Sequence, residues 1–171
     1  RIEIGATMSF DIDEIADLLC KLSNAKSPSG FEEETLSIVR QFTKGWGKVE
    51  TNTLHDGFIT LKNFSGNKPR LMLEAHGDEV GAMVKSIRDN GTMSFVELGR
   101  FTTGVLTGQD VLVRNTEGDW IHGVIGVKPP HFMSSVEKNS GIDPELLLDV
   151  GATSYSDAVE SFHMGMGEPV V

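Results

Sequence analysis

The sequence has almost no cysteine, since Cys20 is the only one among its 171 residues. A single cysteine excludes an intrachain disulfide and suits a reducing compartment, so we expect a cytoplasmic protein. Cys20 stands within a helical pattern and is interpreted as a packing residue rather than a reactive thiol. The sequence also lacks internal repeats, a P-loop, a dinucleotide fingerprint and a G-x-S-x-G motif. Residue types alone still leave Ser–His–Asp or Cys–His catalysis open.

Positive charge is scarce as well, with 15 Lys and Arg against 25 Asp and Glu and a formal net charge of −10. This balance argues against nucleic acid or an anionic membrane as the main partner. No apolar run approaches the roughly 20 residues of a membrane span. The N-terminus has no hydrophobic region typical of a signal peptide. Residues 1–7 precede Met8, and we expect them to be leader or vector-derived residues.

The most informative stretch is a short apolar run, L-M-L at residues 71–73, followed by His76-Gly77-Asp78. The run predicts a strand buried on both faces. The polar group then falls at the carboxyl edge of the sheet, where ligand and metal sites collect in open α/β folds. An imidazole can bind a divalent metal through one nitrogen while a carboxylate orients the other, which fits His76 as ligand and Asp78 as its orienting partner. A hydrogen-bonded histidine at a strand end is the alternative that this spacing leaves open.

The residues before this stretch predict two helices and a hairpin. Apolar residues at three- and four-residue steps predict a first helix that is capped by Asp11. A second helix is expected to start near Phe31, with a solvated acidic first turn at residues 32–34. Residues 48–54 and 58–62 predict two strands around a turn that contains His55.

Beyond Val84, short apolar segments alternate with turn signals and predict a small β-barrel or sandwich. One helix is expected over residues 155–162, with Ser154 as its cap and Asp157 three residues later.

The remaining histidines are interpreted as non-ligands. His131 ends the Lys128-Pro129-Pro130-His131 loop, whose prolines restrict the backbone and indicate a conformational role. His122 and His163 have no acidic partner at a ligand-like offset.

Four stretches together resemble the glutamyl aminopeptidase family, which includes tetrahedral aminopeptidases and proteins labelled endoglucanases. They are S-G-F-E-E-E at 29–34, A-H-G-D-E-V-G at 75–81, G-V-I-G-V-K-P-P-H at 123–131 and L-D-V-G-A-T-S at 148–154. Gly77 stands where this family commonly has Met. The similarity runs in order from about Leu18 to the end of the chain.

The resemblance implies an α/β plus β fold with two main parts. Residues 8–86 would form the N-terminal part of a three-layer αβα catalytic domain. Residues 87–166 would form an inserted PDZ-like β-barrel that helps to build a homo-oligomer, and residues 167–171 would begin the return to the catalytic domain.

The resemblance also implies a metal-dependent aminopeptidase that removes N-terminal residues from peptides, using water activated by two divalent ions, zinc or cobalt. His76 would be a metal ligand and Asp78 would orient it. The family places its other ligands and its general base downstream of the insert, and the sequence contains none of those motifs. We therefore expect the isolated chain to be inactive. The alternative is a non-catalytic assembly or interaction module that acts through the β domain.

Overall fold

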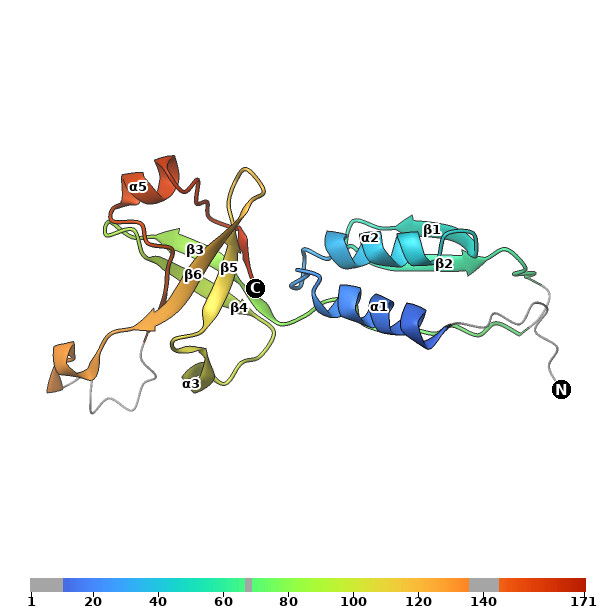
Figure 1. Cartoon of the computed structure of the whole chain (residues 1–171), viewed down its shortest axis with the longest axis horizontal. Helices are drawn as coiled ribbons and strands as arrows, with labels where there is room; N and C mark the ends of the chain where they lie inside the picture. Colours follow the sequence, from blue (N-terminus) through green and yellow to red (C-terminus); the bar gives the residue numbers. More distant parts are fainter. Residues whose placement is uncertain (1–10, 67–68, 136–144) are drawn as a thin grey trace. The chain divides into compact units, whose positions relative to one another are not determined.

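The computed structural model describes residues 11–66, 69–135 and 145–171, and it divides the chain into two compact units. Unit 1 is Arg1–Gly77 and unit 2 is Asp78–Val171. Each unit has its own secondary structure (Figure 1). Unit 2 begins before the expected insert of residues 87–166, because the strand β3 (Gly81–Ile87) is already part of the barrel.

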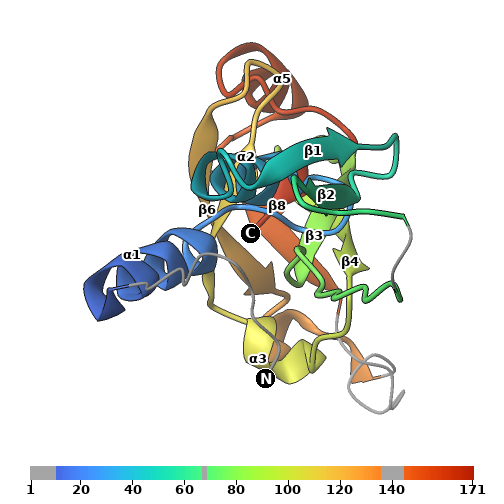
Figure 2. The same cartoon turned by 90° about the vertical axis from the view of Figure 1, so that its right-hand side faces the viewer.

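Two helices open unit 1, as the sequence predicts. The first, α1 (Ile12–Ser23), has Asp11 as its N-cap, and the Asp11 side chain accepts a hydrogen bond from the Asp13 N–H. The second, α2 (Glu33–Phe42), begins slightly later than expected. Figure 2 shows α2 beside the strands of unit 1 and α1 directed away from them.

The predicted hairpin is confirmed as an antiparallel pair, β1 (Gly47–Thr51) and β2 (Gly57–Leu61). The first strand ends earlier than expected because the Asn52 Oδ1 accepts hydrogen bonds from the N–H groups of Leu54 and Asp56, both at 3.0 Å. A side chain that bonds its own backbone in this way stabilises a turn in place of the ladder.

The prediction of a buried strand at residues 71–73 is wrong for this chain. These residues have no strand assignment, and Leu71, Met72 and Leu73 are exposed by 84%, 78% and 87%. A strand that is buried on both faces needs neighbours in its sheet and layers above and below it. Among the described strands, β1 and β2 pair only with each other in unit 1, so these conditions are not met.

Unit 2 is a closed barrel, which decides between the barrel and the sandwich that the sequence left open. The strand order is β3-β4-β7-β6-β5-β8. The other strands are β4 (Met93–Leu98), β5 (Asp110–Arg114), β6 (Trp120–Val127), β7 (Leu146–Asp149) and β8 (Pro169–Val170). Two short helical segments, α3 (Thr103–Leu106) and η1 (Pro130–Phe132), lie in its connections.

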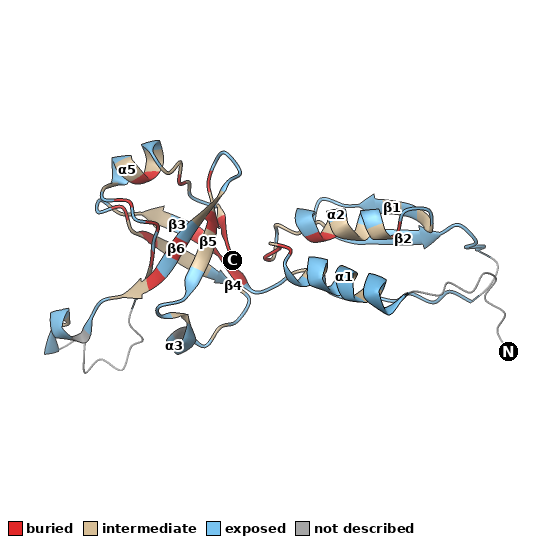
Figure 3. Cartoon of the chain, viewed as in Figure 1, coloured by how far each residue is buried: buried red, intermediate tan, exposed pale blue. Residues whose placement is uncertain are grey.

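The barrel encloses an apolar core, coloured as buried in Figure 3. Its centre is formed by fully buried residues from four strands: Val84, Met93, Val113 and Leu148. The last strand, β8, closes the barrel by pairing with β3 through Ala82↔Val170 and with β5 through Val113↔Val170. The expectation that residues 167–171 only begin a return segment therefore omitted their part in the barrel.

The helix α5 (Tyr155–Glu160) has the predicted cap. The Ser154 Oγ accepts a hydrogen bond from the Asp157 N–H, and the Asp157 carboxylate accepts one from the Thr153 N–H at 2.9 Å. This reciprocal arrangement is a capping box. The backbone hydrogen bond from Thr153 is the main cause that lowers the pKa of Asp157 below its ordinary value. Across the described residues, no helix is long and apolar enough to cross a membrane.

Candidate functional site

The predicted site residues lie where the two units join in sequence. His76 is exposed near the end of unit 1, and Asp78 is half-buried at the start of unit 2. Neither residue follows a strand, because residues 71–78 are extended without a ladder. The structure thus keeps the two residues close in sequence but does not place them at a sheet edge.

The backbone beside His76 passes over a small buried platform. A Cβ added at Gly77 would lie 3.4 Å from the Thr35 Cγ2, so the backbone of Gly77 packs close to this side chain. Thr35 is held in turn by Ser27, whose Oγ lies 3.1 Å from the Thr35 N and 2.9 Å from the Thr35 Oγ1. Ser27 and Thr35 are both buried. This pair fixes the N-terminal turn of α2 next to the stretch that contains His76.

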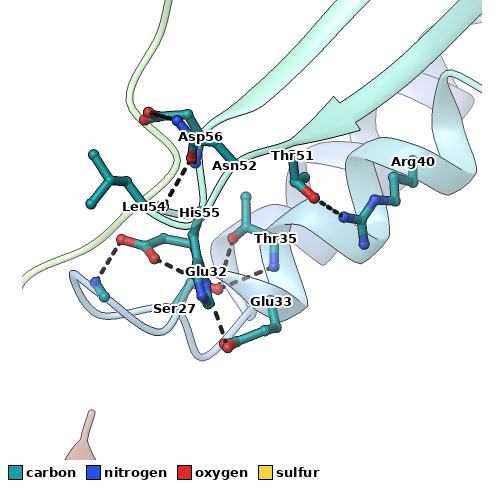
Figure 4. A network of polar contacts seen from close by, with 11 residues as sticks. Ser27, Glu32, Glu33, Thr35, Arg40, Thr51, Asn52, Leu54, His55 and Asp56 are labelled. Atoms are coloured by element: carbon teal, nitrogen blue, oxygen red, sulfur yellow. Dashed lines mark hydrogen bonds and ion pairs between the residues drawn. The ribbon is translucent and has the colours of Figure 1, made fainter.

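A second polar cluster surrounds His55, at the turn between β1 and β2 (Figure 4). Its imidazole Nδ1 lies 3.4 Å from the Glu33 Oε1 and 3.7 Å from the Glu32 Oε2. Within the described residues, this nitrogen and the Glu32 Oε2 are buried without a hydrogen-bond partner. A proton on Nδ1 would allow the imidazole to pair with either carboxylate.

The sequence reasoning missed this cluster. It interpreted residues 32–34 as a solvated first turn, but the Glu32 side chain is largely buried and its Oε1 accepts a hydrogen bond from the Gly30 N–H at 2.7 Å. Glu34 likewise accepts one from the Lys26 N–H at 2.8 Å. His55 is indeed a turn residue, with a φ of +64° that L-residues adopt rarely. No spacing signal joins it to Glu32, because the contact depends on how the hairpin packs on α2.

The described residues do not assemble a set of metal ligands. Among them, no group of three or more His, Cys, Asp and Glu side chains could hold a metal ion. Stable zinc sites use about three or four protein ligands. His76 is thus a single candidate ligand, and the described part of the chain does not by itself fit a metal site.

The other histidines lie in unit 2. The His131 ring contacts the ring of Phe132, with 4.4 Å between the centroids. The His163 Nε2 lies 3.8 Å from the Glu117 Oε1, and His122 is exposed on β6. His122 also lines a surface pocket of the barrel, together with Asp110, Gly123, Val124, Asp149, Val150 and Gly151. This pocket contains neither His76 nor Asp78.

The sequence profile of the M42 glutamyl aminopeptidases matches residues 57–171. A glutamyl aminopeptidase from Lactococcus lactis subsp. cremoris is 29% identical over 164 residues, which cover 92% of this chain and 45% of that protein.

Solved structures agree with this match. A TET aminopeptidase from the marine sediment archaeon Thaumarchaeota archaeon is similar with a TM-score of 0.82 and 34% identity, over 93% of this chain and 44% of that chain. The Pyrococcus horikoshii TET1 peptidase, which can assemble into a tetrahedron or a large octahedral shell, is similar with a TM-score of 0.75 and 26% identity. That match covers 92% of this chain and 46% of the TET1 chain. The chain therefore spans less than half the length of these relatives.

Proposed function

The chain belongs to the M42 glutamyl aminopeptidase family, and we propose that it forms the N-terminal portion of a metal-dependent aminopeptidase that releases N-terminal residues from peptides. The observation that carries this proposal is the match to the TET aminopeptidase, which includes 93% of this chain but 44% of that protein. The remaining length of such relatives is where further catalytic groups would lie. A cytoplasmic location is part of the proposal and fits the single cysteine.

In this proposal the two units have different tasks. Unit 1 and the connection that contains His76 form part of a three-layer αβα catalytic domain. The barrel of unit 2 acts as a PDZ-like insert that helps to build a homo-oligomer. The tetrahedral or octahedral assembly of the TET1 peptidase supports the oligomer, because that protein is similar to this chain over both units.

His76 supplies one metal ligand in the complete enzyme, and Asp78 orients its imidazole. A carboxylate bonded to the second ring nitrogen fixes the tautomer and direction of a ligating histidine. The chemistry that two bound divalent ions, zinc or cobalt, supply in such enzymes is activation of a water molecule for attack on a carbonyl. The described residues offer His76 alone for this purpose, so the other ligands and the general base must come from outside them.

This assignment predicts that the isolated chain binds metal weakly and has no aminopeptidase activity. Calorimetric titration of zinc or cobalt into metal-free protein measures the first property, and release of an amine from amino-acid anilides measures the second. A tight stoichiometric site that disappears in His76→Ala would show that the chain itself contains the missing ligands.

The roles of His76 and Asp78 are tested in a complete enzyme, with the missing portion supplied as one chain or as a separate polypeptide. His76→Ala should lose nearly all activity and one metal site, because both affinity and geometry depend on each ligand. Asp78→Asn should retain metal with activity reduced by about 10–100-fold. His131→Ala is the control and should keep its metal content. Normal metal occupancy and turnover in His76→Ala would contradict the proposed role.

A non-catalytic assembly module is the second candidate, and the closed barrel of unit 2 favours it. A self-contained barrel can mediate association whether or not a catalytic domain is completed. Size exclusion with light scattering should detect dimers or larger species of the isolated chain under either proposal. Oligomers that form without any complementing polypeptide or metal-dependent activity would favour this second candidate.

A further inference from the structure

Unit 1 exposes much of the apolar side-chain area that a folded unit would normally cover. All five residues of β2 are exposed, and this strand contains Phe58, Ile59 and Leu61. The Leu71–Met72–Leu73 run is more exposed still. We define these two segments, residues 57–61 and 71–73, as the open apolar segments of unit 1. Contiguous apolar exposure of this kind marks an interaction site in a folded protein.

The open segments differ from ordinary exposed apolar residues in their sequence pattern. The run at 71–73 has the composition of a strand that is covered on both faces. In the described chain it is extended but makes no ladder, and β2 has a single strand partner. Unpaired backbone groups on a strand edge are a template for pairing with another chain. The pattern and the structure therefore disagree in a specific way, because the covering layers and strand neighbours are missing.

The barrel does not need such a partner for its own strands. Its sheet is closed, and its core is formed from residues of unit 2 alone. The open apolar segments lie in the unit that precedes the barrel, on the portion that the family match places in a protein of more than twice this length.

We propose that the open apolar segments of unit 1 bind the polypeptide that corresponds to the uncovered portion of M42 relatives, and that binding converts residues 71–75 into a strand. This inference rests on the proposed function. Since His76 directly follows residues 71–75, association with the complementary polypeptide orders the backbone before His76 without any metal. Metal binding then follows this association.

The test uses the full chain and, as the probe, the portion of the TET aminopeptidase from Thaumarchaeota archaeon that this chain does not cover. Affinity is measured by calorimetry, and hydrogen exchange of the backbone amides of residues 71–75 is followed, both in EDTA. Exchange should slow at least tenfold on binding. The matching N-terminal portion of the TET aminopeptidase is the positive control. A fusion of the two polypeptides, joined after Val171, ensures that low affinity does not hide the contact.

Two matched variants make the test specific to the surface. Met72 is 78% exposed in unit 1 and Met166 is 73% exposed in unit 2. Met72→Asp should weaken binding at least tenfold and leave residues 71–75 unprotected, while Met166→Asp should change the affinity less than twofold. Both side chains are exposed, so neither substitution removes core packing.

Each outcome decides the proposal. Unprotected residues 71–75 in the fusion, or equal binding by Met72→Asp and the unaltered chain, would overturn it. A dimer of this chain that Met72→Asp abolishes, with no binding of the probe, would assign the surface to a second copy instead. A complex that shows the expected protection but no metal-dependent aminopeptidase activity would refute the proposed function and leave the interaction intact.

Discussion

The two units differ in how they bury apolar residues. Unit 2 has a continuous core that includes Met93 and Leu148, both fully buried, inside a closed barrel. In unit 1, neither α1 nor β2 has a buried residue, and the buried positions of α2 are limited to Thr35. Most folding free energy comes from such burial. The unit with the candidate ligand His76 is thus the less self-sufficient of the two, and its local stability should be lower.

The largest effect should come from the core of the barrel. Leu148→Ala should lower the free energy of unfolding of unit 2 by about 2–5 kcal/mol, because it removes buried methyl groups and leaves a cavity. Leu73→Ala, at the exposed run of unit 1, should change it by less than about 0.5 kcal/mol. The two tryptophans report on the units separately in urea titrations, since Trp46 lies in unit 1 and Trp120 in unit 2. Equal effects of the two substitutions would contradict the difference in packing.

Glycine substitutions should give an intermediate effect. Gly91 in unit 2 has a φ of +86°, and a Cβ there would lie 2.5 Å from the backbone oxygen of Ala152. Gly91→Ala should therefore cost about 2–3 kcal/mol, combining backbone strain with a steric clash. Gly30 in unit 1 has a φ of +91° but nothing within 4 Å of the added Cβ. Gly30→Ala should cost about 1 kcal/mol from the backbone alone. Thermal unfolding of both variants measures the difference, which would vanish if the Gly91 turn were free to move.

The smallest effect should be a dependence of barrel stability on acid. Hydrogen bonds from Thr153 lower the pKa of Asp157 in the folded protein below its ordinary value of 3.8. The resulting stabilisation is complete above the pKa of the unfolded chain and is lost as the pH falls through the lower folded pKa. Asp157→Asn should therefore lower the Tm of unit 2 at neutral pH by less than Leu148→Ala does. The difference between Asp157→Asn and the unaltered protein should shrink near pH 2. A Tm difference that stays constant between pH 7 and pH 2 would contradict the assigned role of the carboxylate.

The sequence by itself determined the local elements and the family. Asp11 and Ser154 cap their helices as predicted, because a cap depends on a side chain and the backbone within three residues of it. The hairpin around His55 and the short strands after Val84 also follow from local turn chemistry and alternation. The family resemblance came from short motifs, and the match to residues 57–171 confirms it.

Only the tertiary structure decided which of these elements are covered. The run at residues 71–73 reads as a buried strand, yet burial requires partners that the described chain does not place there. The contact between His55 and Glu32 depends on the packing of the hairpin against α2, which no local pattern encodes. The role of Val170 in closing the barrel likewise depends on strands distant in sequence, β3 and β5. Local sequence sets backbone preferences over a few residues, whereas burial, ion-pair contacts and sheet closure are properties of segments that meet only in the folded chain.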